Sequence, residues 1–109
     1  MGRAFPILML LALCGCSSPE ARQAAMQSKA DSCLKHGQAI EDAKACLADR
    51  GLKSPGHVRT GNPPKDYVTY SACGLYWRAP LFGSCGGLHV QVDHGLVQSW
   101  QAWGQWDGP

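Results

Sequence analysis

Apolar residues in the middle of the chain recur at the spacing of an amphipathic helix. Ile40, Ala43 and Leu47 fall on one side of a helical wheel, which predicts a helix over residues 39–50 with one face toward a core. Gly51 follows directly, and a glycine just beyond the last helical residue is typical of a left-handed helix end. This segment is the clearest helix that the sequence predicts.

Another helix is predicted ahead of it, over residues 19–35. Ser18 can cap this helix, Pro19 suits its first position, and Glu20 lies at the positive end of the helix dipole. The stretch is rich in alanine but has a modest apolar face, so its first half is expected to be flexible linker rather than packed helix. Gly37 separates the two helices.

After the helices the pattern changes to that of strands. Residues 53–65 hold two clusters of proline and glycine, which predicts a loop. Residues 67–70 are β-branched and aromatic, and residues 88–93 alternate between apolar and polar side chains. A turn at His94-Gly95 leads into a returning strand over residues 96–103. The expected fold class is α+β, with two helices packed on a three-stranded antiparallel sheet.

Tryptophans recur every third residue in and after the last predicted strand, at Trp100, Trp103 and Trp106. A two- or four-residue hairpin loop pairs Val92 with Val97 and places Trp103 on the core face, whereas a three-residue loop places Trp100 there. In either case an indole lies on the sheet face away from the helices. There it either docks a partner or is shielded by the folded-over tail.

The N-terminal residues are organised like an export signal. One basic residue, Arg3, precedes an apolar run over residues 5–13 that is too short to span a bilayer. Leu13, Gly15 and Cys16 then resemble the lipobox of bacterial lipoproteins, in which cleavage follows the glycine and the cysteine sulfur accepts a diacylglyceryl group. The alternative is an ordinary secretory signal, and both interpretations export the chain.

The predicted organisation has three parts. Residues 1–15 form a lipoprotein signal peptide, residues 16–36 a lipid-anchored tether with the first helix, and residues 37–109 a small α+β domain. A domain of this size is marginal on hydrophobic burial alone, so it needs covalent support.

Cysteines supply that support. Four remain once Cys14 and Cys16 of the signal region are set aside, and an even number of thiols in an exported chain predicts two disulfides. Four cysteines allow three connectivities, and sequence alone leaves them open. Proximity along the chain favours two pairs, which are Cys33 with Cys46 and Cys73 with Cys85.

The segment between Cys73 and Cys85 is unusually apolar for a loop, because loops run on the surface and are commonly polar. Its residues either continue the strands into the core or form a disulfide-stiffened tip that meets a partner, with Arg78 at its edge. The candidate partner-binding residues of this segment and of the last strand are Tyr76, Trp77, Arg78, Phe82, Trp100 and Trp103.

Signatures of catalysis and metal binding are absent from the sequence. The chain after the signal has no nucleophile elbow, phosphate loop, H-E-x-x-H or C-x-x-C motif, so neither enzyme activity nor a cofactor is expected. Cys73 and Cys85 lie too far apart along the chain to form a zinc set with His89 and His94, so no metal is expected. The formal net charge of +2 is spread among interspersed acidic residues, which argues against nucleic acid.

The order of these features resembles a known family. Between Gly37 and Val97 the chain has an acidic pair in a helix, a helix end at Gly51, a tyrosine-rich strand and an alternating strand that ends at Val92-Asp93. This order is similar to the small outer-membrane lipoproteins of the BamE (SmpA/OmlA) type. The resemblance implies two helices on a three-stranded antiparallel sheet.

The resemblance also implies a function. It predicts an accessory or scaffold role in outer-membrane assembly or integrity, exerted by binding an envelope protein partner. Ser17 after Cys16 resembles the pattern that sorts lipoproteins to the outer membrane, facing the periplasm. The alternative is a periplasm-facing inhibitor or ligand-capturing lipoprotein that uses the apolar segment between Cys73 and Cys85.

Overall fold

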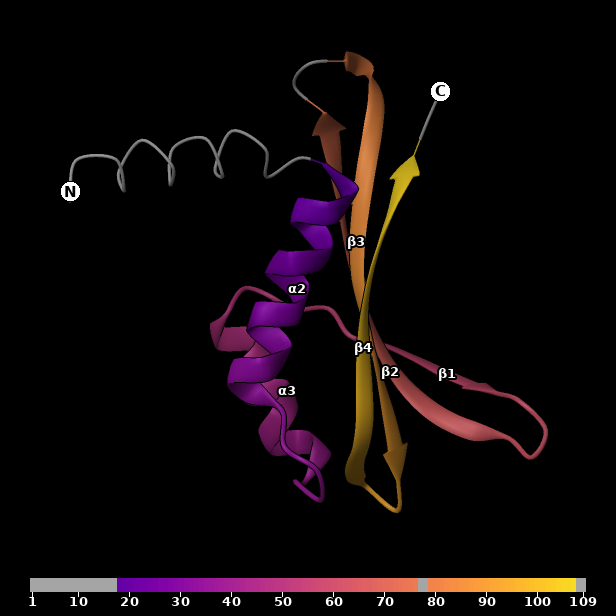
Figure 1. Ribbon diagram of the computed structural model, residues 1–109. Coiled ribbons are helices and arrows are strands. Elements are labelled where there is room, and N and C mark those ends of the chain that lie inside the picture. Colours follow the sequence, from indigo (N-terminus) through magenta and orange to yellow (C-terminus); the bar gives the residue numbers. More distant parts are fainter. Residues whose placement is uncertain (1–17, 77–78, 108–109) are drawn as a thin grey trace.

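The computed structural model describes residues 18–76 and 79–107. Two helices, α2 (Pro19–Cys33) and α3 (Ile40–Asp49), cover one face of an antiparallel sheet (Figure 1). None of the helices in these ranges is long and apolar enough to cross a membrane. The sheet contains, in chain order, β1 (Gly56–Thr60), β2 (Lys65–Tyr76), β3 (Ala79–Asp93) and β4 (Leu96–Asp107).

The architecture is α+β with two disulfides, but the predicted three-stranded sheet is wrong because the sheet has four strands. The additional strand, β1, lies where the sequence predicted a loop, and it pairs with β2 from Gly56 opposite Thr69 to Thr60 opposite Lys65. Nearly all of its side chains are exposed, so β1 has no buried apolar alternation by which it could be recognised. Its hairpin with β2 bends away on the side opposite the helices (Figure 1).

Helix α2 begins as the sequence predicted. The Ser18 hydroxyl accepts a hydrogen bond from the Ala21 N–H at 3.2 Å, and Pro19 occupies the first turn. The helix is continuous, and its buried residues, which include Met26 and Ala30, face the sheet. The expectation of a flexible linker in its first half is therefore wrong, because this half is helix packed on the sheet.

Helix α3 ends in the predicted left-handed turn. Gly51 has a φ of 97°, and the Leu52 N–H donates to the Leu47 carbonyl at 2.9 Å. Leu52 is buried beside this helix end, as Ala43 and Leu47 are along the helix. The apolar stripe thus faces the core that the helices share with the sheet, and the largest fully buried apolar residues there are Leu47, Leu88, Val90 and Val97.

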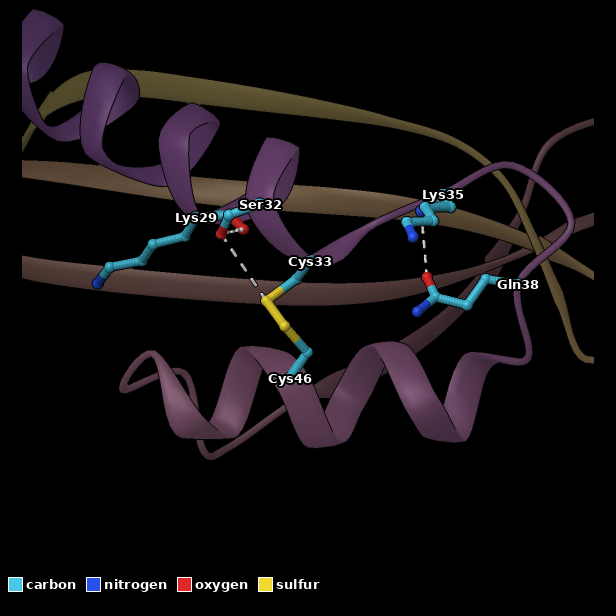
Figure 2. Close-up of a disulfide and its surroundings, with 6 residues drawn as sticks. All are labelled: Lys29, Ser32, Cys33, Lys35, Gln38 and Cys46. Atoms are coloured by element: carbon cyan, nitrogen blue, oxygen red, sulfur yellow. Dashed lines mark hydrogen bonds between the residues drawn. A yellow bond between two sulfur atoms is a disulfide. The ribbon is translucent and has the colours of Figure 1, made fainter.

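A disulfide between Cys33 and Cys46 joins α2 to α3 (Figure 2). The Cα atoms of the pair are 5.5 Å apart, and Cys33 is buried in the core. The second disulfide joins Cys73 to Cys85. Both pairs have the connectivity that proximity along the chain favoured.

The turn between β3 and β4 has the predicted residues, but the side chains that follow it in β4 do not lie on the predicted faces. His94 and Gly95 both have positive φ, as a type I′ hairpin turn requires, and Val92 lies opposite Val97. The next pair, however, is Gln91 opposite Ser99, so Gln98 is an extra residue in a β-bulge. The bulge reverses the alternation along β4.

This reversal corrects the expected placement of the tryptophans. The expectation that a two-residue loop puts Trp103 on the core face is wrong, because Trp100 packs against the core and Trp103 lies on the opposite face. The Trp100 indole N–H donates to the Asp31 carboxylate of α2 at 3.3 Å. Trp100 therefore helps to hold the helix layer on the sheet.

Tyr70 carries a buried hydroxyl that has no hydrogen-bond partner among the described residues. Its side chain is 4% exposed, and the hydroxyl makes no hydrogen bond with any residue that the structure describes. Burial raises the pKa of Tyr70, and the negative charge of Glu41 adds to this effect. Because the folded pKa is the higher one, this contribution to stability is present below the ordinary tyrosine pKa and is lost as the pH rises through the folded value.

We therefore expect Tyr70→Phe to be tolerated. At neutral pH the free energy of unfolding should be unchanged or increased by about 1 kcal/mol, because an unsatisfied hydroxyl is removed. At strongly alkaline pH the variant should lose less stability than the native protein. Urea unfolding at both pH values, with Tyr67→Phe as the control, measures this. A large loss of stability at neutral pH would show that the hydroxyl has a partner.

Candidate functional site

The sheet face turned away from the helices, here called the open face, is the candidate functional site. It contains a hollow of about 870 Å³, and a second hollow of about 480 Å³ shares His89, Gln101 and Trp103 with it. The side chains that matter most for its chemistry are Tyr67, Thr69, His89, Gln91, Gln101 and Trp103.

Strand register brings these residues together. His89 of β3 lies between Thr69 of β2 and Gln101 of β4, each directly opposite it in the ladder. Side chains alternate along a strand, so cross-strand partners project on the same face. Three residues far apart in sequence therefore form one row across the open face, in which the His89 and Gln101 side chains are exposed.

Trp103 lies next to this row and is seated on a glycine. Trp103 is paired with Gly87 across the ladder, and a Cβ atom on Gly87 would overlap the six-membered and five-membered rings of the indole. The indole therefore covers the backbone of Gly87, as aromatic residues do for glycines in sheets. Its Nε1 is buried there without a hydrogen-bond partner among the described residues.

His89 supports the indole from the side. The two rings meet edge to face, with centroids 6.1 Å apart and an interplanar angle of 71°. Trp103 also lines both hollows. Trp103 is thus a fixed, flat surface at the centre of the open face.

On the helix side of β3, the close contact is made at the preceding residue, Gly86. A Cβ on Gly86 would lie 2.7 Å from the Arg22 Cβ, so α2 packs directly on the β3 backbone at this point. The Arg22 Nε–H donates to the buried Ser84 hydroxyl at 2.6 Å. Gly86 therefore allows close approach of the α2 backbone on one face of the sheet, and Gly87 allows close approach of the indole on the other.

The segment between Cys73 and Cys85 is a hairpin arm rather than a loop. The two cysteines are opposite each other in the β2–β3 ladder with Cα atoms 4.1 Å apart, and pairing continues to Tyr76 opposite Ala79. The strands continue through this segment, but the side chains of residues 75–82 lie outside the described ones, so their predicted place in the core stays a prediction. Trp77 and Arg78 lie outside the described residues, and so do the side chains of Tyr76 and Phe82, so their predicted role in partner binding stays a prediction.

The candidate zinc residues do not come together as a metal site. Cys73 and Cys85 lie close to Asp107, but their sulfurs are joined in a disulfide and are not thiolate ligands. His94 sits in the hairpin turn and contacts Asp93 at 3.0 Å. At the rise of an extended strand it is roughly 30 Å from Cys85 along β3. The proposed lipidation residue, Cys16, lies outside the described residues.

Sequence reasoning placed a tryptophan on the open face but missed its polar neighbours. His89 is a polar position of the alternating segment 88–93, but no local pattern links it to Gln101, which it faces only through the strand register. The glycine pair before Leu88 was the available signal, because glycine within a strand often marks close approach by another group.

Comparison with protein families, curated proteins and solved structures finds no match for this chain.

The contact between the Trp103 indole and Gly87 leads to a prediction about stability. Gly87→Ala should lower the free energy of unfolding by about 1 to 3 kcal/mol, because the new methyl group occupies the position of the indole. In a Trp103→Ala background the same substitution should cost much less, since the ring is gone. Urea unfolding of the four proteins in this double-mutant cycle measures the coupling. Equal costs in both backgrounds would mean that the indole does not rest on Gly87.

Proposed function

We propose that this protein is a lipid-anchored component of the bacterial envelope that acts by binding and not by catalysis. In this proposal Cys16 carries the lipid, and the domain faces the periplasm from the outer membrane. The resemblance to lipoproteins of the BamE (SmpA/OmlA) type favours an accessory or scaffold role in outer-membrane assembly or integrity.

The observation that supports binding most directly is the difference between the two faces of the sheet. One face is filled by α2 and α3, whereas the open face keeps a hollow around a fixed indole and exposed amide and imidazole groups. A concave surface with a few polar groups around an aromatic side chain is the usual form of a binding site. The two disulfides suit the oxidising compartment that an export signal implies.

A second candidate is ligand capture or inhibition by the β2–β3 arm. Its backbone extends past the first turn of α2 (Figure 1), and the Cys73–Cys85 disulfide braces it. Such an arm can enter the cleft of a target while the rest of the domain stays outside. Loss of binding on substitution of Tyr76 or Phe82, with no effect of open-face variants, would favour this candidate.

The anchor is tested by fractionation. Cys16→Ser should move the protein from the membrane fraction to the soluble periplasmic fraction, because the sulfur that accepts the lipid is lost. Ser18→Ala, which leaves the lipobox residues intact, is the control and should remain with the membrane. Retention of the Cys16→Ser protein in membranes would refute the anchor assignment.

The binding role is tested in cells. A strain without the protein should be more sensitive to detergents that enter through a weakened envelope, and the native chain should restore resistance. Gln101→Ala removes only an exposed side chain of the open face, so a stable Gln101→Ala protein that fails to restore resistance supports the proposal. Full restoration by every open-face variant would contradict it.

A further inference from the structure

We infer that the open face binds a neutral oligosaccharide, with Trp103 as the stacking surface and Gln101 and His89 as hydrogen-bonding groups. This inference rests on the proposed function, because it names the ligand of the same surface. Three properties of the face support it, which are its lack of charge, the setting of its indole and the shape of its hollows.

The first property is charge. Among the described residues around the two hollows there is no carboxylate, ammonium or guanidinium group. Nucleic acids and acidic peptides are bound mainly through such counter-charges, so this face offers them little. Amides and hydroxyls both donate and accept hydrogen bonds, as does a neutral imidazole through its two nitrogens, and the hydroxyl groups of a sugar need both functions.

The second property is the setting of Trp103. One side of the indole rests on the Gly87 backbone and His89 meets it edge to face, so the ring is held in place before any ligand arrives. A pyranose ring presents a flat side of C–H bonds with its hydroxyls at the rim. That side stacks on an aromatic face, while the hydroxyls reach polar groups around it. A ring that is already fixed loses little conformational freedom on binding.

Polar side chains lie beside the indole, where they can reach the hydroxyls of a stacked sugar. Gln101 and His89 lie opposite each other and next to Trp103, and both line the two hollows. Further along the larger hollow, the Ser99 hydroxyl donates to the Gln91 side-chain oxygen at 3.5 Å. Planar amides beside an aromatic ring give directional contacts to hydroxyl groups.

The third property is shape. The hollows of about 870 and 480 Å³ share His89, Gln101 and Trp103, so the hollowed surface extends beyond a single pocket along this part of the sheet. The larger one is within the size range of ligand sites. An extended chain of linked sugars, with one ring on Trp103, fits this arrangement better than a single sugar does.

A protein partner suits the face less well. The core of a protein interface is apolar, and polar groups buried there without partners cost free energy. On the open face the row of Thr69, His89 and Gln101 would be desolvated by a docked protein. The large apolar side chain exposed around the hollow is Val58, which lies on the outer strand β1.

The test is a titration with two neutral tetrasaccharides, chitotetraose and cellotetraose. The acylated protein is kept in a detergent without a sugar headgroup, and the Cys16→Ser protein is measured in parallel without detergent. Tryptophan fluorescence and amide NMR shifts report binding. We expect saturable shifts at Thr69, His89 and Gln101 with at least one of the sugars, and none with polyglutamate of similar length.

Variants locate the site. Trp103→Ala should weaken sugar binding about tenfold or more through loss of stacking, and Gln101→Ala should weaken it about three- to tenfold through loss of a hydrogen bond. Trp106→Phe is the control and should change the affinity less than about twofold, because Trp106 does not line the two hollows. Gln101→Ala keeps the test valid if Trp103→Ala fails to fold, since the Gln101 side chain is exposed.

Three results would overturn the inference. They are the absence of open-face shifts with both sugars, equal binding of the sugars by native and Gln101→Ala proteins, and crosslinking of a protein to position 103 in intact envelopes without sugar binding. Each of these leaves the anchor proposal intact, because that depends on fractionation of the Cys16→Ser protein. Membrane retention of that variant, conversely, does not affect sugar binding by the purified chain.

Discussion

Two adjacent glycines in β3 let other groups approach the sheet backbone from both sides. Gly86 receives Arg22 of α2, and Gly87 receives the indole of Trp103. A side chain at either position would occupy the space of the group packed against it, because Cβ atoms on neighbouring strand residues point to opposite faces. The position of the helix layer and the setting of the open-face indole therefore depend on the same dipeptide.

Local signals made part of the fold predictable. The cap at Ser18, the left-handed end at Gly51 and the turn at His94-Gly95 each depend on a few neighbouring residues, and the structure has all three. Strand β1 was missed because it is exposed along nearly its whole length, so no apolar pattern marks it. The three-strand expectation, which the resemblance also implied, fails for that reason.

The candidate site was harder to predict than the fold because it depends on register. An alternating pattern gives the face of each residue only while the count remains regular, and the extra residue at Gln98 changes that count. Sequence reasoning could therefore state that an indole lies on the open face but assigned the wrong one for this turn. The row formed by Thr69, His89 and Gln101 comes from three strands, and no local pattern connects them.

If Cys16 is acylated as proposed, the early start of α2 limits the distance between the domain and the membrane. Ser18 already caps a helix that is packed on the sheet. With Cys16 acylated as proposed, only the backbone between Cys16 and Ser18 would connect the lipid to the folded domain. An extended chain spans at most about 3.6 Å per residue, which gives a reach of roughly 10 Å. The domain would then stay in contact with the membrane surface, and any ligand of the open face would have to reach it there.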